Sequence, residues 1–414
     1  MTRWLKGMGP GLLVTAAFIG PGTVFTASGS GAQFGLELLW AAMFSILAAM
    51  ILQEMAARLG VVAKQGLGEA IRESLPHPGM RFAAVVLVVS AIAIGNAAYQ
   101  YGNIIGAVTG VMGALSKPPE WSYKPVIVGV VGVVALGLLA TGSVRAIQVA
   151  LSALVAVMSV VFIVTALMTP ADWSDAAAGL VPHVPEGSLV KVIALIGTTV
   201  VPYNLFLHAS ASRERWAKDD KKNALAEARF GTLTAIAIGG LITISILFVA
   251  AGTFPKGTEL ESATLAQRMF KGLGETGQWM FALGLFAAGL TSSVTAPLAA
   301  AYATSGIIGF SKDERPWVFR GVWLAVLAIG TGFAMFMEAS PAVGIVIAQA
   351  TNGVLLPLIA GFLLWVVNRR KVMGDFTNGI ITNILGVAVI GVAAVLGYRN
   401  LHSAVSKVIE YFGG

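Results

Sequence analysis

The sequence predicts an all-α integral membrane protein, from its composition and from apolar runs long enough to cross a bilayer. Of the 414 residues, 57% are hydrophobic and 11% are charged. A chain with so few charged residues cannot both fill a core of this size and cover it with a wetted surface. The sequence therefore predicts one transmembrane domain over residues 1–414 and excludes the water-soluble fold classes.

Each predicted span is an apolar run of about 20 residues, the length of helix that crosses a hydrocarbon core. The third and eighth runs are long enough to hide two short spans each, but splitting only one of them would reverse every later loop. We therefore predict eleven spans, at about 9–33, 36–58, 82–113, 125–143, 146–169, 190–210, 230–253, 277–308, 317–337, 341–367 and 376–398.

The basic residues predict the orientation of these spans. With a cytoplasmic N-terminus, 19 of the 27 Lys and Arg residues fall on the cytoplasmic side and 8 on the other. This asymmetry is typical of cytoplasmic loops, so the net charge of +7 does not indicate nucleic acid as a partner. An odd number of spans then places the C-terminus outside. The first run has no persuasive cleavage site, so we interpret it as a retained span rather than a signal peptide.

Two of the runs contain helix breakers at membrane depth. The stretch "FIGPGTVFTASGSG" places Gly20, Pro21 and Gly22 inside the first run, and "LIGTTVVPYNLFLHAS" places Pro202 inside the sixth. A single proline kink is common in membrane helices. Two interrupted helices at matching positions of two five-span halves instead indicate the binding site of a secondary transporter.

Four motifs in order resemble the NRAMP family of divalent-metal transporters. They are "GPGT" in span 1, "LQEMAARLGVV" with "GLGEAIRE" after span 2, "VVPYNLFLHAS" in span 6 and "AQATNGVLLP" in span 10. The resemblance implies the LeuT-type fold of the APC superfamily. It implies inverted repeats of five helices at about 9–169 and 190–367, with an added helix at about 376–398, and helices 1 and 6 broken at the midplane.

The chain departs from the family where the metal should bind. The family's Asp and Asn of span 1 are Gly20 and Thr23 here, its Met and His of span 6 are Val201 and Tyr203, and Asn96 and Tyr99 replace the carboxylates of its proton route. Carried over by position, the resemblance assigns the substrate site to Gly20, Pro21, Gly22, Thr23, Thr198, Val201, Pro202, Tyr203, Asn204 and Gln349.

This residue set leaves the substrate class open. Removal of the Asp and the Met takes away the charge and the softness that favour dehydrated transition metals, so no metal ligand is assigned. The N-termini of the two half-helices favour negative charge, which makes a small anion the first expectation and leaves the carboxylate of an organic zwitterion open. The alternative is a divalent cation such as hydrated Mg²⁺ or Mn²⁺, as in the wider family. Hydroxyls near the break, including Thr23, have the alternative role of capping the half-helix.

Other polar residues have two interpretations each. His208 is either a coupling or gating residue or a hydrogen-bonded structural histidine. Asn96 and Tyr99 are either part of a coupling or gating route or packing residues. Glu54 is a weaker candidate for coupling, because an interfacial packing carboxylate is more common. Gln349 either completes the site or satisfies freed backbone groups.

The expected function is alternating-access transport of a small ion or polar solute across the plasma membrane, by a monomer without a cofactor. A channel of the same architecture would conduct without saturation. An enzyme would need a nucleophile or metal cluster, and the sequence has no cysteine and no such motif. A receptor without transport activity is the remaining alternative.

Overall fold

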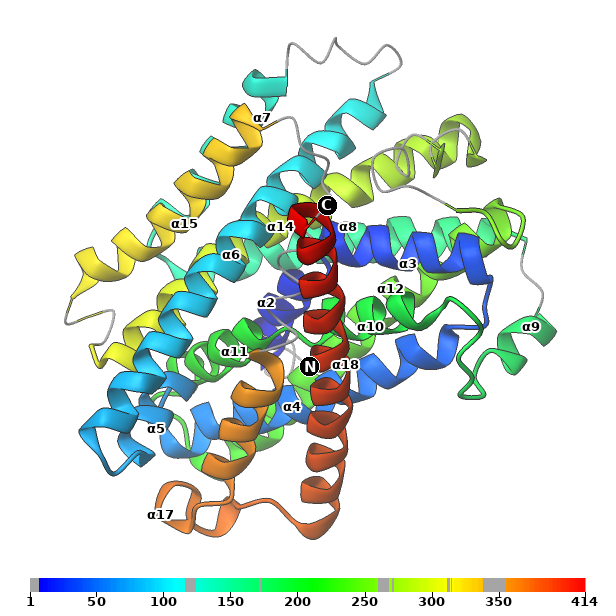
Figure 1. Ribbon diagram of the computed structural model, residues 1–414. Helices are drawn as coiled ribbons and strands as arrows, with labels where there is room; N and C mark the ends of the chain where they lie inside the picture. Colours follow the sequence, from blue (N-terminus) through cyan, green and yellow to red (C-terminus); the bar gives the residue numbers. More distant parts are fainter. Residues whose placement is uncertain are drawn as a thin grey trace.

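The computed structural model describes residues 7–115, 124–170, 173–259, 268–269, 272–310, 313, 315–337 and 355–413. All regular elements in these ranges are helices (Figure 1). The described chain is therefore an all-α membrane protein, as the composition predicts.

The helices match the predicted spans in order. Seven helices are long and apolar enough to cross a membrane, one bent pair passes the same test together, and three shorter helices are apolar, including Leu355–Val367. The principal helices are α2 (Gly9–Phe18), α3 (Pro21–Phe34), α4 (Leu39–Ala63), α6 (Pro78–Ala114), α7 (Lys124–Ala140), α8 (Val144–Met168), α10 (Leu189–Thr199), α11 (Pro202–Arg215), α12 (Lys221–Thr253), α14 (Gly274–Ile308), α15 (Pro316–Phe336) and α18 (Ile380–Gly413).

The two long runs that might have been split are each one continuous helix. α6 has 37 residues and α14 has 35, and they pack along each other. In α14 the interior Pro297 does not end the helix. α15 packs against both α6 and α14, and Figure 1 shows it running beside α6. Retaining each as a single span, as the charge pattern requires, was correct.

Two helix boundaries differ from the expected ones, and two short helices are additional. α12 begins at Lys221 rather than near residue 230, because Asp220 caps the helix by accepting a hydrogen bond from the Asn223 N–H at 3.3 Å. α18 continues to Gly413, well past residue 398. Short helices α5 (Leu67–Ser74) and α9 (Trp173–Ala178) lie between spans. Hydropathy locates the apolar part of a helix, whereas capping and propensity set its ends.

The outer surface of the bundle is apolar, as expected of helices that face lipid. Large side chains such as Leu167, Phe336 and Ile380 are at least three-quarters exposed. The small and polar residues are buried instead, above all along α3, α11 and α14. Because the polar residues are buried and the outer surface is apolar, we expect a polar binding site in the interior, around the two broken helices.

Candidate substrate site at the two broken helices

The first break lies between α2 and α3, whose axes differ by 59°. Gly20 is the N-cap residue of α3 and is extended, and Pro21 is the first helical residue, where its missing N–H costs nothing. The hydroxyl of Thr23 donates to the carbonyl of Phe18 at 2.5 Å, across the break. Thr23 therefore bridges the two half-helices, which is the capping role anticipated as its alternative.

The residues that face this break come from α6 and α14. A Cβ atom at Gly20 would lie 2.8 Å from Ser292 Oγ and 3.4 Å from Asn103 Oδ1. A Cβ at Gly106 would overlap with the ring of Pro21. The break is thus closely surrounded by polar side chains of two other helices, and Gly20 leaves them room.

The second break separates α10 from α11 at Val200 and Val201. Val201 is extended and is the N-cap residue of α11, and Pro202 begins the helix. The hydroxyl of Thr198 donates to the carbonyl of Ala194 at 3.0 Å, within its own helix. Neither half-helix that begins at a break, α3 or α11, has an acidic residue in its first turn.

A pair of tyrosines connects the second break to α6. The rings of Tyr99 and Tyr203 lie edge to face, with centroids 5.6 Å apart. Asn96, one turn earlier on α6, donates from Nδ2 to the carbonyl of Ala296 on α14 at 3.0 Å. The residues that replace the family's proton route are thus buried packing and hydrogen-bonding groups, and Tyr99 borders the Tyr203 side of the site.

Several buried polar atoms of α3, α6 and α11 have no hydrogen-bond partner among the described residues. Both side-chain atoms of Asn204, in the first turn of α11, are unpaired, as is Nδ2 of Asn103. Oε1 of Gln100 and the hydroxyls of Ser28 and Ser30 are also unpaired. Because an unpaired buried polar atom is costly, such a set indicates atoms that a substrate or its water contacts.

His208 is held between two neutral side chains. Its Nδ1 lies 3.0 Å from Gln53 Oε1 and its Nε2 lies 3.3 Å from Thr232 Oγ1. The ring is completely buried and connects α11 to α4 and α12. This geometry fits the structural alternative for His208 and places no charged partner on either ring nitrogen.

Glu54 lies in a different environment from the two breaks. Its carboxylate accepts hydrogen bonds from Arg58 on α4 and from Arg229 on α12. Gln349 falls outside the described residues. The structure thus brings together Gly20 and Pro21 with residues of α6 and α14, Thr23 with Phe18, and Tyr203 with Tyr99.

Two residues of this site, Asn103 and Ser292, were not among those predicted. The signal for Asn103 was present, since "YQYGNIIG" carries an amide inside an apolar span. Ser292 gave a weaker signal, because serines in "LTSSVTAP" are equally common as small packing residues. Which serine of this motif faces Gly20 depends on the rotation of α14 about its axis relative to α3, and a single sequence does not specify that rotation.

A cavity of about 770 Å³ lies beside the first turn of α2, at the end of the bundle opposite the break in that helix. Its lining includes Arg145 and Gln148 of α8 and Arg215 at the end of α11. Arg215 is 3.7 Å from the carboxylate of Asp219. Positive charge therefore lines this cavity, partly balanced by one acidic residue.

The described residues contain no group of three or more His, Cys, Asp or Glu that would hold a metal ion. A cation bound near the breaks would therefore rely on amide, hydroxyl and carbonyl oxygens. These are hard ligands without charge, which suit a cation that keeps some of its water.

Comparison with known proteins gives a consistent family. The profile described as "Natural resistance-associated macrophage protein-like" (Nramp) matches residues 11–403. The divalent metal cation transporter MntH of Verminephrobacter eiseniae is 29% identical, over 94% of this chain and 87% of that protein. MntH of Deinococcus radiodurans is also 29% identical, over 96% of this chain and 89% of that protein.

Solved structures agree with the fold. The manganese transporter of Eremococcus coleocola superposes with a TM-score of 0.77 at 21% identity, over 97% of this chain and 87% of that chain. MhsT in complex with L-phenylalanine superposes with a TM-score of 0.57 at 15% identity, over 96% of this chain and 98% of that chain. These similarities establish a LeuT-type fold.

Proposed function

Because the chain belongs to the Nramp family of multi-pass secondary transporters, we propose that it carries a divalent cation that keeps part of its hydration shell. The names of the MntH relatives, divalent metal cation transporters, support a divalent cation. At Gly20 and Val201 the chain lacks the family's charged and thioether ligands. Because uncharged ligands do not offset the cost of full dehydration, this loss supports a cation that keeps part of its water.

The unpaired amide of Asn204 carries this proposal. It is completely buried at the start of α11, beside the break, and neither side-chain atom has a partner in the part of the chain that the structure describes. The water shell of a cation directs O–H groups outward, so acceptors such as Asn204 Oδ1 and Gln100 Oε1 bind it through water. The family's Asp would instead bind the ion directly.

Uptake into proteoliposomes that contain an entrapped indicator for divalent cations tests the proposal. We expect saturable uptake of Mg²⁺ or Mn²⁺, reduced at least tenfold by Asn204→Ala. Asn223→Ala, an exposed asparagine at the start of α12, is the matched control and should leave uptake unchanged. No divalent uptake, or uptake that Asn204→Ala leaves intact, would contradict the proposal. Uptake that does not saturate would indicate a channel.

A small anion is the second candidate substrate. Two features favour it: the half-helix N-termini at the breaks without nearby acidic residues, and the arginine-lined cavity beside α2. Chloride or phosphate uptake by the same proteoliposomes, with no divalent uptake, would support the anion and overturn the cation.

The organisation of the carrier is part of the proposal. We assign the repeats to about 9–169 and 190–367, with α18 outside both, and we propose that a single chain suffices for transport. The enclosure of both breaks by helices of one chain supports the last point.

A further inference from the structure

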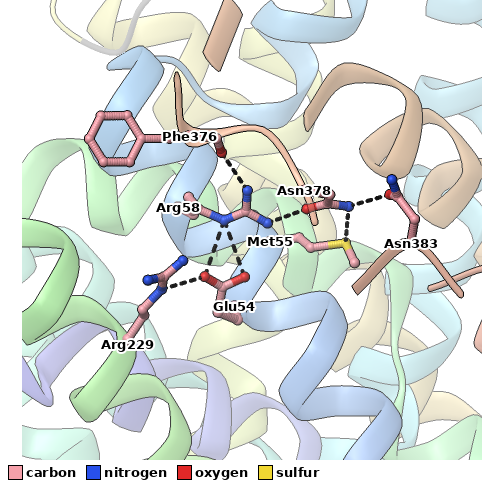
Figure 2. Close-up of polar contacts among 7 residues, drawn as sticks. All are labelled: Glu54, Met55, Arg58, Arg229, Phe376, Asn378 and Asn383. Atoms are coloured by element: carbon pink, nitrogen blue, oxygen red, sulfur yellow. Dashed lines mark hydrogen bonds and ion pairs between the residues drawn. The ribbon is translucent and has the colours of Figure 1, made fainter. Parts of the chain in front are cut away.

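A second cavity, of about 400 Å³, lies between α4, α12 and the start of α18, away from the broken helices (Figure 2). Its lining has charged and polar residues, among them Glu54, Arg58, Arg229, Thr377 and Thr382, and apolar residues, among them Met50 and Leu385. We propose that this cavity binds the headgroup phosphate of an anionic phospholipid, whose acyl chains continue along the apolar residues.

The charges beside the cavity leave one arginine available. Arg58 is only 3% exposed and is fully engaged: its Nε lies 3.1 Å from Glu54, its Nη1 donates to the Phe376 carbonyl at 2.6 Å, and its Nη2 donates to Asn378 Oδ1. Arg229 is 51% exposed and donates to Glu54 only from Nε, at 2.8 Å.

The terminal nitrogens of Arg229 therefore remain for a ligand. Figure 2 shows them next to the Glu54 carboxylate, and they have no partner among the described residues. One carboxylate between two guanidinium groups leaves an excess of one positive charge. A guanidinium with its terminal nitrogens unused matches the paired oxygens of a phosphate.

The start of α18 adds donors to the same cavity. Its lining includes Asn378 and Gly379, directly before the helix begins at Ile380. The side-chain oxygen of Asn378 accepts a hydrogen bond from Arg58 Nη2. The lining at the start of α18 therefore offers an anion the first N–H groups of the helix and the hydroxyls of Thr377 and Thr382 as donors.

The surroundings favour a lipid over a soluble phosphate. Beside the cavity, α12 exposes Phe230 and Leu233, and α18 exposes Ile381 and Ile384. Arg229 stands where α12 changes from a charged first part, which begins with Lys221, to an apolar one. Basic pockets between membrane helices at this depth bind anionic headgroups.

Thermal unfolding of the full chain in mixed micelles tests the site. We expect phosphatidylglycerol, and not phosphatidylcholine at the same mole fraction, to raise the midpoint of unfolding. Arg229→Gln should weaken the apparent affinity about fivefold, the contribution of one arginine near a membrane surface, and Arg229→Lys should retain most of it. Arg320→Gln, at an exposed arginine on α15, is the control and should leave the shift unchanged.

Two further measurements separate the alternatives. Thr382→Val leaves every ion pair in place, so it tests the cavity without disturbing Glu54, and we expect a smaller shift. An undiminished shift in both Arg229→Gln and Thr382→Val would overturn the proposal. A full shift with inorganic phosphate or glycerol phosphate would show a site for a free anion only, and would also overturn it.

Discussion

The asparagines inside the bundle fall into two kinds, and the difference predicts how each tolerates change. Asn96 and Asn204 are both almost fully buried. Asn96 donates to a carbonyl of α14, whereas the side chain of Asn204 has no hydrogen-bond partner within the described ranges. A residue retained at a cost to stability is expected to contribute to function.

The first prediction compares these two residues. Asn204→Ala should leave the free energy of unfolding within about 0.5 kcal/mol, because it removes no hydrogen bond. Asn96→Ala should cost about 1–2 kcal/mol, because the Ala296 carbonyl loses its donor. Thermal unfolding in detergent measures both. Equal losses would mean that Asn204 is a structural residue.

The second prediction concerns the position of the missing carboxylate. Gly20→Asp with Val201→Met restores the family's ligands and should raise Mn²⁺ affinity, by an amount on the order of a few kcal/mol. Since the new Cβ would lie 2.8 Å from Ser292 Oγ, the gain should be larger when Ser292→Ala is added. Calorimetry checks the order of affinities. Tight Mn²⁺ binding by the unmodified chain, lost in Thr23→Ala, would show that a neutral site already binds transition metals.

At the scale of residues, some features of the site were predictable from the sequence and others were not. Both breaks were predictable from Pro21 and Pro202, because proline interrupts a helix through its own covalent structure. The role of Thr23 as a bridge across the break, and the approach of Asn103 and Ser292 to Gly20, were not. These depend on how helices distant in sequence rotate against each other, which no local pattern records.

At the scale of elements, α18 packs on the bundle through one face, while many of its larger side chains are exposed. That face includes the buried Val389 and Ala393, and Gly386, which approaches Met55 of α4 closely. Arg58 contributes the polar connection, through the Phe376 carbonyl and Asn378 just before α18 (Figure 2). The eleventh helix was predictable from hydropathy, but this attachment was not.

The third prediction is that Arg58→Gln loosens this attachment. The substitution leaves the Phe376 carbonyl and Asn378 without a donor, while Glu54 keeps Arg229. We expect a loss of about 2 kcal/mol in the free energy of unfolding and faster proteolysis of the segment before α18. Arg320→Gln is the control. Unchanged proteolysis would show that apolar packing alone holds the helix.

At the scale of the whole molecule, the basic residues predict the topology. The order of described helices agrees with eleven spans, so the N- and C-termini should lie on opposite sides. The fourth prediction is that a reporter fused after Gly414 is active only outside the cytoplasm, and one before residue 1 only inside. Cytoplasmic activity of the C-terminal fusion would mean that the span count is wrong by one.

The last prediction concerns the driving force for transport. Where the family has carboxylates for a proton route, this chain has an amide at Asn96 and a phenol at Tyr99, and neither exchanges a proton near neutral pH. Asn96 is moreover committed to the Ala296 carbonyl. His208 is the remaining intramembrane residue predicted for coupling, but its two ring nitrogens face the neutral Gln53 and Thr232.

Uptake of the substrate should therefore proceed without stoichiometric proton movement, and a transmembrane pH gradient should not drive it. Proteoliposomes that contain a pH-sensitive dye measure this directly, with the entrapped divalent indicator in parallel samples. Acidification that disappears in His208→Ala while substrate uptake continues would assign proton coupling to that histidine. Acidification in step with uptake that survives His208→Ala would contradict this account, because it would require a proton route through residues other than those that replace the family's carboxylates.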